Sequence, residues 1–135
     1  MKCRASLRIS DDNLEPAEIT KILCIEPDKS HKKNDPNLGI SKKGKIFMNS
    51  TYTSGLWSID SKEDESMNLE HHIASLLHVV YPMKDKFTML SNMGYKINVF
   101  CGVFAFDADQ PGFSICPDVL QKLGELNIML DVCIY

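Results

Sequence analysis

Three histidines fall in one predicted helix and are the first residues whose type could do chemistry. His71 and His78 are seven residues apart, so they share a face about 10 Å from each other at a rise of 1.5 Å per residue. A metal bound there would need further ligands from other segments. The spacing of His71, His72 and His78 therefore favours histidines on a solvated helix face. We expect no metal and no cofactor.

One cysteine and two aspartates are the next candidates for catalysis. Cys116 precedes Pro117 at a predicted helix start, where the helix N-terminus can lower the pKa of a thiol. No histidine or acid is tied to Cys116 by spacing, which favours a small residue in a tight turn. Asp107 and Asp109 could bind a cation or act as acid and base, but in a loop with Pro and Gly they are ordinary turn formers.

The known sequence motifs of nucleotide-binding loops, zinc proteases and serine hydrolases are absent. The chain has no G-x-x-x-x-G-K, no G-x-G-x-x-G, no H-E-x-x-H and no G-x-S-x-G. We therefore expect that the protein is not an enzyme.

Aromatic and basic residues on two predicted strands could imitate a sheet that stacks RNA bases. The residues are Phe100, Phe104 and Phe106 with Arg4 and Arg8. The net charge of −3 and the pI of about 5.8 weigh against this hypothesis, because nucleic acids and anionic membranes bind basic surfaces. We interpret the phenylalanines as core residues and expect neither nucleic acid nor membrane as a direct partner.

Charge is segregated along the chain. Residues 29–45 are basic and residues 60–70 are acidic, and segments of opposite sign can steer a charged protein partner. Acidic side chains can also stand in for phosphates in the basic cleft of a nuclease. The predicted partner-binding residues are Asp60, Glu63, Asp64, Glu65 and Trp57.

Hydrophobic periodicity predicts the elements that hold these residues. The clearest helix carries an apolar stripe at helical spacing, made of Leu69, Ile73, Leu76, Leu77 and Val80. Asn68 is its expected N-cap and Pro82 its expected end or kink. The pattern predicts strands over 2–10, 45–49, 55–60, 95–106 and 128–135, helices over 16–23 and 117–124, and further helical turns near 87–90. Residues 28–45 are expected to form a basic, mobile loop.

The element order β-α-β-β-α-β-α-β predicts an α+β fold. In such a two-layer sandwich, helices pack on one face of a mainly antiparallel sheet, and a ferredoxin-like arrangement is the expected topology. If the helices cover only one face, an exposed apolar patch bordered by Phe104, Met129 and Tyr135 is expected on the other.

The bulk composition is typical of one globular domain. The chain has 135 residues, of which 44% are hydrophobic, and we expect a single domain over residues 1–135. Its five cysteines include no C-x-x-C pair, which is typical of a reducing compartment. No apolar run reaches the roughly 18 residues of a membrane span, and the N-terminus lacks the apolar core of a signal peptide. We therefore expect a cytoplasmic protein.

Several stretches in order give the chain a family resemblance. They are residues 14–20, 23–27, 55–59, 69–77 and 117–135. Over these segments the chain resembles the bacterial family called domain of unknown function 4279, with one departure at Cys24, where Gly is expected. The resemblance implies a bacterial intracellular protein without an assigned reaction, and no catalytic residue carries over. Some members look similar to immunity proteins encoded beside secreted toxins, as in contact-dependent inhibition.

These observations lead to two main hypotheses. The first is a non-catalytic immunity protein that binds a cognate toxin domain, for example a nuclease, and neutralises it. The alternative is a small-ligand or metabolite-binding module with a pocket between the sheet and the basic loop near Trp57. An enzyme that uses Cys116 or the histidines is a third hypothesis, which the absence of motifs disfavours.

Overall fold

A computed structural model describes residues 1–105 and 112–135. The main sheet contains β1 (Lys2–Asp11), β2 (Lys29–His31), β5 (Gly55–Asp60), β6 (Lys96–Phe104) and β7 (Met129–Ile134), and β3 (Pro36–Ile40) and β4 (Ile46–Thr51) form a separate two-stranded sheet. The helices are α1 (Pro16–Leu23), α2 (Leu69–Val80), α3 (Lys84–Asn92) and α4 (Pro117–Glu125), with a 3-10 turn at Tyr81–Met83 between α2 and α3. None of the described helices is long and apolar enough to cross a bilayer.

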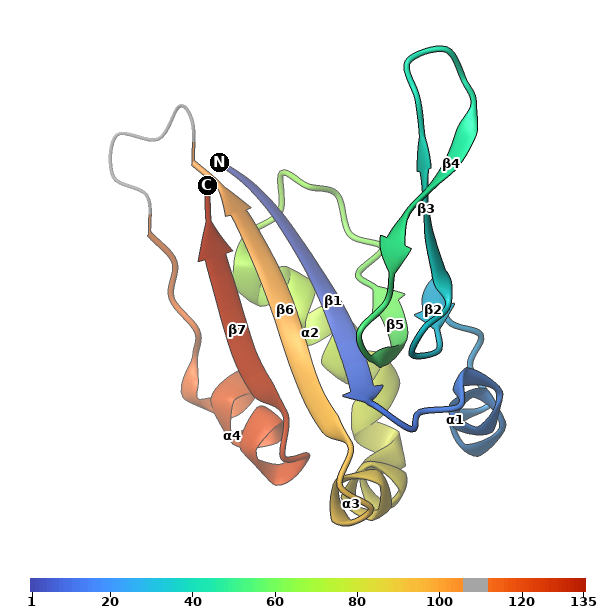
Figure 1. Ribbon diagram of the computed structural model, residues 1–135. Helices are drawn as coiled ribbons and strands as arrows, with labels where there is room; N and C mark the ends of the chain where they lie inside the picture. The colour runs from blue at the N-terminus through green and yellow to red at the C-terminus, as the bar shows by residue number, and fades with distance from the viewer. Residues whose placement is uncertain (106–111) are drawn as a thin grey trace.

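The main sheet has the strand order β2-β5-β1-β6-β7. Its first three pairings are antiparallel, whereas β6 and β7 are parallel and are joined through α4, as a parallel pair requires a crossover. The α+β class, the mainly antiparallel sheet and the layer of helices behind it are confirmed (Figure 1). The ferredoxin-like topology and the predicted element order are not confirmed.

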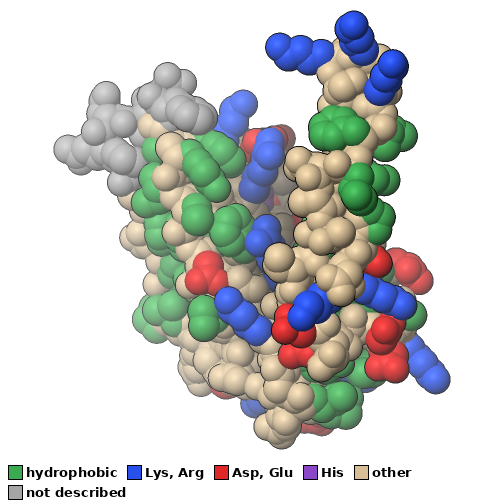
Figure 2. Space-filling model, viewed as in Figure 1, with side chains coloured by type: hydrophobic (Ala, Val, Ile, Leu, Met, Phe, Trp, Pro, Cys, Tyr) green, Lys and Arg blue, Asp and Glu red, His purple; other side chains and the backbone are tan. Residues whose placement is uncertain are grey.

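The core lies between the sheet and the helices. Along β1, Cys3, Ala5, Leu7 and Ile9 are buried, while the residues between them are exposed or half-buried. This alternation places one face of the strand against the helices. The opposite face, here called the open face, is the side toward the viewer in Figures 1 and 2.

Helix α2 follows the sequence prediction closely. The Asn68 side chain accepts a hydrogen bond from the backbone N–H of His71 at 2.8 Å, which is the N-cap interaction expected at this position. All five residues of the apolar stripe are buried. Pro82 ends the α-helical geometry, and the chain continues through the 3-10 turn into α3.

The backbone conformation at the end of α1 explains why the family pattern has Gly at the position of Cys24. Cys24 follows the helix with a φ of 56°, in the left-handed region that glycine adopts most easily. A side chain in that conformation costs free energy, so Gly is the residue expected there.

The prediction of a loop over residues 28–45 is wrong. This stretch contains β2 and β3, and β3 pairs with β4 in a hairpin. The sequence of the hairpin does not alternate between buried apolar and exposed polar residues, because every residue of β4 is exposed. Periodicity detects a strand through its buried face, and this pair of strands has none.

Candidate functional site

His71 and His72 of α2 contact different side chains of the preceding segment. His71 Nε2 lies 3.1 Å from Glu63 Oε2, whereas His72 is buried with its Nδ1 atom 2.9 Å from Ser61 Oγ. No group of three His, Cys, Asp or Glu ligands occurs in the described part of the chain. The burial of His72 was not predicted, because its position lies beside the apolar stripe rather than within it.

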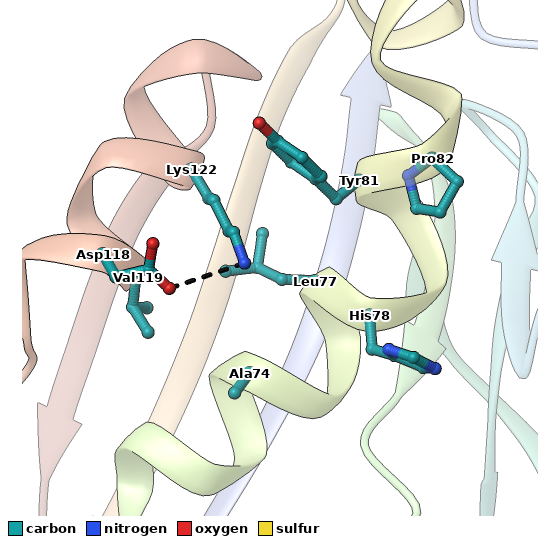
Figure 3. Close-up of a pocket in the computed structure, with 8 residues that line it drawn as sticks. All are labelled: Ala74, Leu77, His78, Tyr81, Pro82, Asp118, Val119 and Lys122. Atoms are coloured by element: carbon teal, nitrogen blue, oxygen red, sulfur yellow. Dashed lines mark ion pairs between the residues drawn. The ribbon is translucent and has the colours of Figure 1, made fainter.

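His78 lies at a shallow pocket between α2 and α4 (Figure 3). The pocket has a volume of about 250 Å³. The Tyr81 hydroxyl donates a hydrogen bond to Glu125 at 2.6 Å, and Lys122 Nζ lies 5.3 Å from the Tyr81 ring centroid and pairs with Asp118. These contacts connect the turn after α2 to α4.

The other catalytic candidates are equally isolated. The Cys116 side chain is exposed, and its backbone N–H donates a hydrogen bond to Glu70. No histidine contact with Cys116 is found among the described residues. Asp107 and Asp109, like Phe106, lie outside the residues that the structure describes.

The predicted acidic segment is anchored along the edge of β1. We call residues 60–68, which lead from the end of β5 to α2, the acidic link. The backbone N–H of Ser61 donates to the carbonyl of Ala5 at 2.9 Å, and the N–H of Cys3 donates to the carbonyl of Glu65 at 2.9 Å. The acidic link therefore borders the sheet instead of extending freely into solvent.

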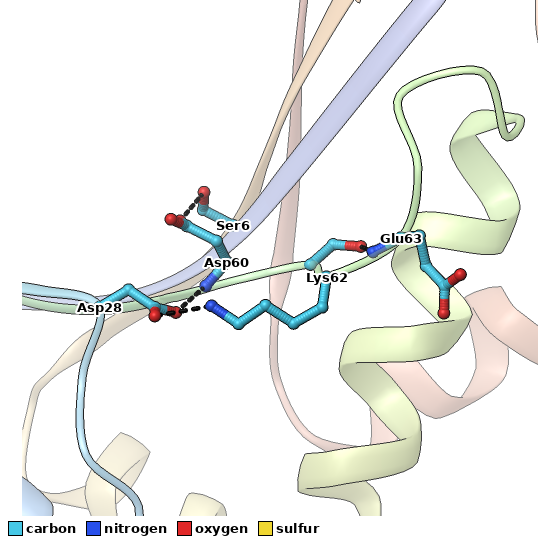
Figure 4. A network of polar contacts seen from close by, with 6 residues as sticks. Ser6, Asp28, Asp60, Lys62 and Glu63 are labelled. Atoms are coloured by element: carbon cyan, nitrogen blue, oxygen red, sulfur yellow. Dashed lines mark hydrogen bonds and ion pairs between the residues drawn. The ribbon is translucent and has the colours of Figure 1, made fainter.

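Asp60 and Asp28 form a network at the start of the acidic link (Figure 4). The Ser6 hydroxyl donates to the Asp60 carboxylate at 2.7 Å, and the Asp60 backbone N–H donates to Asp28 at 2.7 Å. Lys62 Nζ lies 2.6 Å from the other Asp28 oxygen. The hydrogen bond from Lys62 and that from the Asp60 backbone lower the pKa of Asp28.

The remaining carboxylates of the acidic link also have partners. Glu65 pairs with Arg4 at 3.2 Å, and Glu63 pairs with His71. Asp64 accepts a hydrogen bond from the backbone N–H of Ser66 at 2.9 Å, and hydrogen bonds from Ser66 lower the pKa of Asp64. The predicted residues are thus brought together, but much of their charge is engaged within the protein.

Trp57 is the one predicted partner-binding residue that the structure removes from the surface. Its side chain is 0% exposed, and its Nε1 atom donates to Thr20 Oγ1 in α1 at 3.0 Å. A buried indole needs such a partner for its N–H. Trp57 fastens α1 to the sheet, and a partner on the surface would not contact it.

Phe100 and Phe104 lie on the open face and not in the core, which corrects our interpretation of them. Both are half-buried. The Arg8 guanidinium carbon lies 4.2 Å from the Phe100 ring centroid, and that of Arg4 lies 5.5 Å from the Phe104 centroid. Contacts of this kind are cation–π interactions. The sequence prediction failed because both faces of β6 carry apolar residues.

The apolar patch expected on the open face is confirmed. Phe104 stacks on Tyr135 with ring centroids 5.0 Å apart and an interplanar angle of 13°. Tyr135 is 58% exposed and Met129 is 53% exposed. The space-filling view shows apolar side chains grouped over β6 and β7 beside a row of basic ones (Figure 2).

The β3–β4 hairpin projects from the main sheet (Figure 1). The pairs Leu38–Met48 and Ile40–Ile46 lie opposite each other in its register, so these four side chains share one hairpin face. They are 59–75% exposed. The turn between the strands carries Lys42, Lys43 and Lys45, visible as basic side chains at the tip in Figure 2.

The base of the hairpin meets the open face at a pocket of about 250 Å³. There the rings of His31 and Tyr52 stack at 3.4 Å. Arg8, Lys96 and Asn98 contribute to the same pocket. The His31 Nδ1 atom is buried without a hydrogen-bond partner, so the pocket combines two cations with an unused polar atom.

Comparison with known proteins gives a family and no further relative. Neither the curated proteins nor the solved structures include a significant match to this chain. The sequence model of the family described as a domain of unknown function, DUF4279, matches residues 1–135. On that match over its whole length, the chain belongs to the DUF4279 family.

Proposed function

We propose that this protein works by binding a protein partner and not by catalysis. The observation that supports the proposal best is the hairpin, whose Leu38, Ile40, Ile46 and Met48 side chains share an exposed face. Large apolar side chains grouped on a projecting element mark an interaction surface. A hairpin of two strands is only marginally stable by itself, and a partner that buries this face would stabilise it.

The partner that we propose is a cognate bacterial toxin domain, which the protein would neutralise in the cytoplasm as an immunity protein. This part of the proposal follows the resemblance of some family members to toxin immunity factors.

If the toxin is a nuclease, the acidic link is the proposed contact with its basic cleft. Asp64 is exposed, and the side chains of Glu63 and Glu65 are 37% and 44% exposed. A toxin arginine or lysine could replace Arg4 or His71 as their partner. Trp57 has no part in this contact, because it is buried.

A rescue experiment tests the immunity proposal. The C-terminal domain of the protein encoded by the adjacent upstream reading frame is expressed in a host cell with and without this protein, and survivors are counted. Restored growth supports the proposal. A domain that kills equally in both cells contradicts it for that neighbour.

The hairpin is tested in the same assay. The variant Ile40→Ser with Ile46→Ser should lose rescue, because it removes half of the apolar hairpin face. The matched control is Val79→Ser with Met89→Ser, two exposed apolar residues of α2 and α3. Equal loss in both variants, at equal protein levels, would argue against a specific role of the hairpin.

The acidic link is tested by reversing its charge. The triple variant Glu63→Lys, Asp64→Lys and Glu65→Lys should weaken binding to a nuclease toxin, measured with the purified domains. Unchanged affinity would remove the acidic link from the interface while leaving the binding proposal intact.

The second candidate function is binding of a small anionic metabolite in the pocket at the base of the hairpin. The presence of Arg8, Lys96 and His31 in the lining of this pocket favours it. In a thermal-shift screen of nucleotides and phosphorylated metabolites, a compound that binds should raise the unfolding temperature. The variant Arg8→Ala should abolish that shift. A flat response across the set contradicts this candidate.

A further inference from the structure

Seven of the nine lysine and arginine side chains that form no ion pair in the described structure gather on one side of the molecule. By register, Lys2, Arg8, Lys29 and Lys96 belong to the open face of the main sheet, and Lys42, Lys43 and Lys45 lie at the hairpin turn. Across the described residues, none of these seven cations forms an ion pair, whereas Arg4, Lys32, Lys33, Lys62, Lys84 and Lys122 each do.

This distribution is unusual for a chain with a net charge of −3. A cation that has an acidic neighbour contributes little field beyond it, whereas several unpaired cations on one face sum to a positive potential. By the same register, Asp60 and Asp131 also belong to the open face, where they accept hydrogen bonds from Ser6 and Asn98. The four unpaired cations of the main sheet outnumber these two carboxylates, so the open face is suited to an anionic partner even though the chain as a whole is acidic.

Arg8 is the best-placed of these cations for recognition. It is half-buried and its guanidinium lies over the Phe100 ring, which holds the planar group in one orientation. A fixed guanidinium can present two N–H donors to a carboxylate. Less conformational entropy is lost when such a preorganised group binds.

A pocket beside Arg8 lies on the same face and shares two of these cations, Arg8 and Lys96. The buried Nδ1 atom of His31 has no hydrogen-bond partner, and an unpaired buried polar atom costs free energy. Lys96 and Asn98 line the same pocket. The Asn98 amide donates to Asp131 at 2.6 Å, so a carboxylate side chain entering the pocket would meet the Arg8 and Lys96 cations.

We propose that the open face, with the hairpin beside it, binds an acidic segment of a protein partner that also carries apolar side chains. The proposal deepens the protein-binding function above by naming the chemistry of the partner and the surface it occupies. The carboxylates would pair with Arg8, Lys96 and Lys29. The apolar side chains would pack on the Phe104–Tyr135 patch and on the hairpin.

A nucleic acid fits this surface less well. Its phosphates would use the cations but leave the exposed apolar side chains of the hairpin without a role. The acidic remainder of the chain would also repel a long polyanion. An acidic protein segment uses both the charge and the apolar area.

The test is fluorescence polarisation with the full chain and three labelled probes. The probes are a twelve-residue peptide of repeated Glu-Glu-Phe, its Lys-Lys-Phe counterpart and a twelve-nucleotide oligothymidine. We expect saturable binding of the acidic peptide only, with an affinity that falls as salt is added.

Two charge-reversal variants locate the site. Arg8→Glu with Lys96→Glu should weaken binding of the acidic peptide by about tenfold or more. The control, Lys21→Glu with Lys86→Glu, changes the net charge equally at cations of α1 and α3 that form no ion pair in the described structure, and should stay within about twofold. If substitution of Arg8 prevents folding, Lys29→Glu with Lys96→Glu replaces it, with the same expected loss.

Three results would overturn the proposal: no saturable binding of the acidic peptide, equal loss in the control variant, or tighter binding of the oligonucleotide. These results are separate from the rescue experiment. Peptide binding without rescue would contradict the toxin proposal and support the open face as a binding surface. Rescue that persists in both open-face variants would support the toxin proposal and contradict the proposed role of the open face.

Discussion

The acidic link and the open face carry charges of opposite sign, and they differ in how many of these charges have partners within the protein. In the acidic link, Glu65 pairs with Arg4, Glu63 pairs with His71, and Asp60 accepts a hydrogen bond from Ser6. On the open face, Lys29 and Lys96 have no ion pair in the described structure. The acidic charges serve largely to attach a connecting segment to the sheet, while the basic charges are free for a partner.

The difference teaches that a run of charge in a sequence is not a measure of available charge. Residues 60–70 are the more conspicuous acidic run, but their carboxylates find partners on β1 and α2. Among the unpaired open-face cations, Lys2 and Arg8 are six residues apart on β1, and Lys29 and Lys96 come from two other strands, so no local run marks them. Only the pairing of the strands brings them together.

The largest expected loss of stability concerns Trp57, which belongs to the core although it was predicted to bind a partner together with the acidic link. Trp57→Ala should lower the free energy of unfolding by about 3–5 kcal/mol, because it leaves a large cavity and removes the hydrogen bond to Thr20. Urea denaturation measures this change. A small loss of unfolding free energy, together with a native fluorescence spectrum typical of a solvent-exposed tryptophan, would show that Trp57 is not buried.

The next effect tests the charge network at the start of the acidic link. Asp28→Asn should cost about 1 kcal/mol at pH 7, because the charge-assisted contact with Lys62 is lost at an exposed position. The pKa of Asp28 is lower in the folded protein than in the unfolded chain, so its contribution is present above about pH 4 and is lost as the pH falls further. Unfolding measured at several pH values should show the difference between variant and parent shrinking below that pH.

A smaller effect should distinguish the paired arginine from the unpaired one. A double-mutant cycle with Arg4→Ala and Glu65→Ala should give a coupling energy of about 0.5 kcal/mol, the size typical of an exposed pair. The same cycle with Arg8→Ala and Glu65→Ala should give a coupling close to zero. Equal coupling in the two cycles would show that Arg8 is neutralised by the acidic link after all.

The smallest effect on stability is expected in the hairpin. Ile40→Ser with Ile46→Ser should change the free energy of unfolding by no more than about 0.5 kcal/mol, since these side chains are exposed. Leu7→Ala, in the buried face of β1, is the contrasting control and should cost about 2–5 kcal/mol. A large loss from the hairpin variant would mean that the hairpin supports the fold and is not reserved for a partner.

Several elements could be predicted because they have a buried face and local caps. The alternation in β1 and the stripe of α2 both indicate which side chains face the core, and Asn68 and Pro82 mark where α2 begins and ends. The strands β2 and β3 could not be predicted this way. They are short or exposed, and their stability comes from hydrogen bonds to β5 and β4, which are neighbours in space.

The sequence by itself determined the α+β class, the clearest helix and the residues of the acidic link, because these depend on periodicity, capping and composition along the chain. The tertiary structure decided which charges are available. It buried Trp57, paired the carboxylates of the acidic link and placed Arg8 over Phe100. The physical reason is that exposure and ion pairing depend on which strands lie side by side, and the register of β1 with β6 joins residues that are as many as 102 positions apart, as Lys2 and Phe104 are.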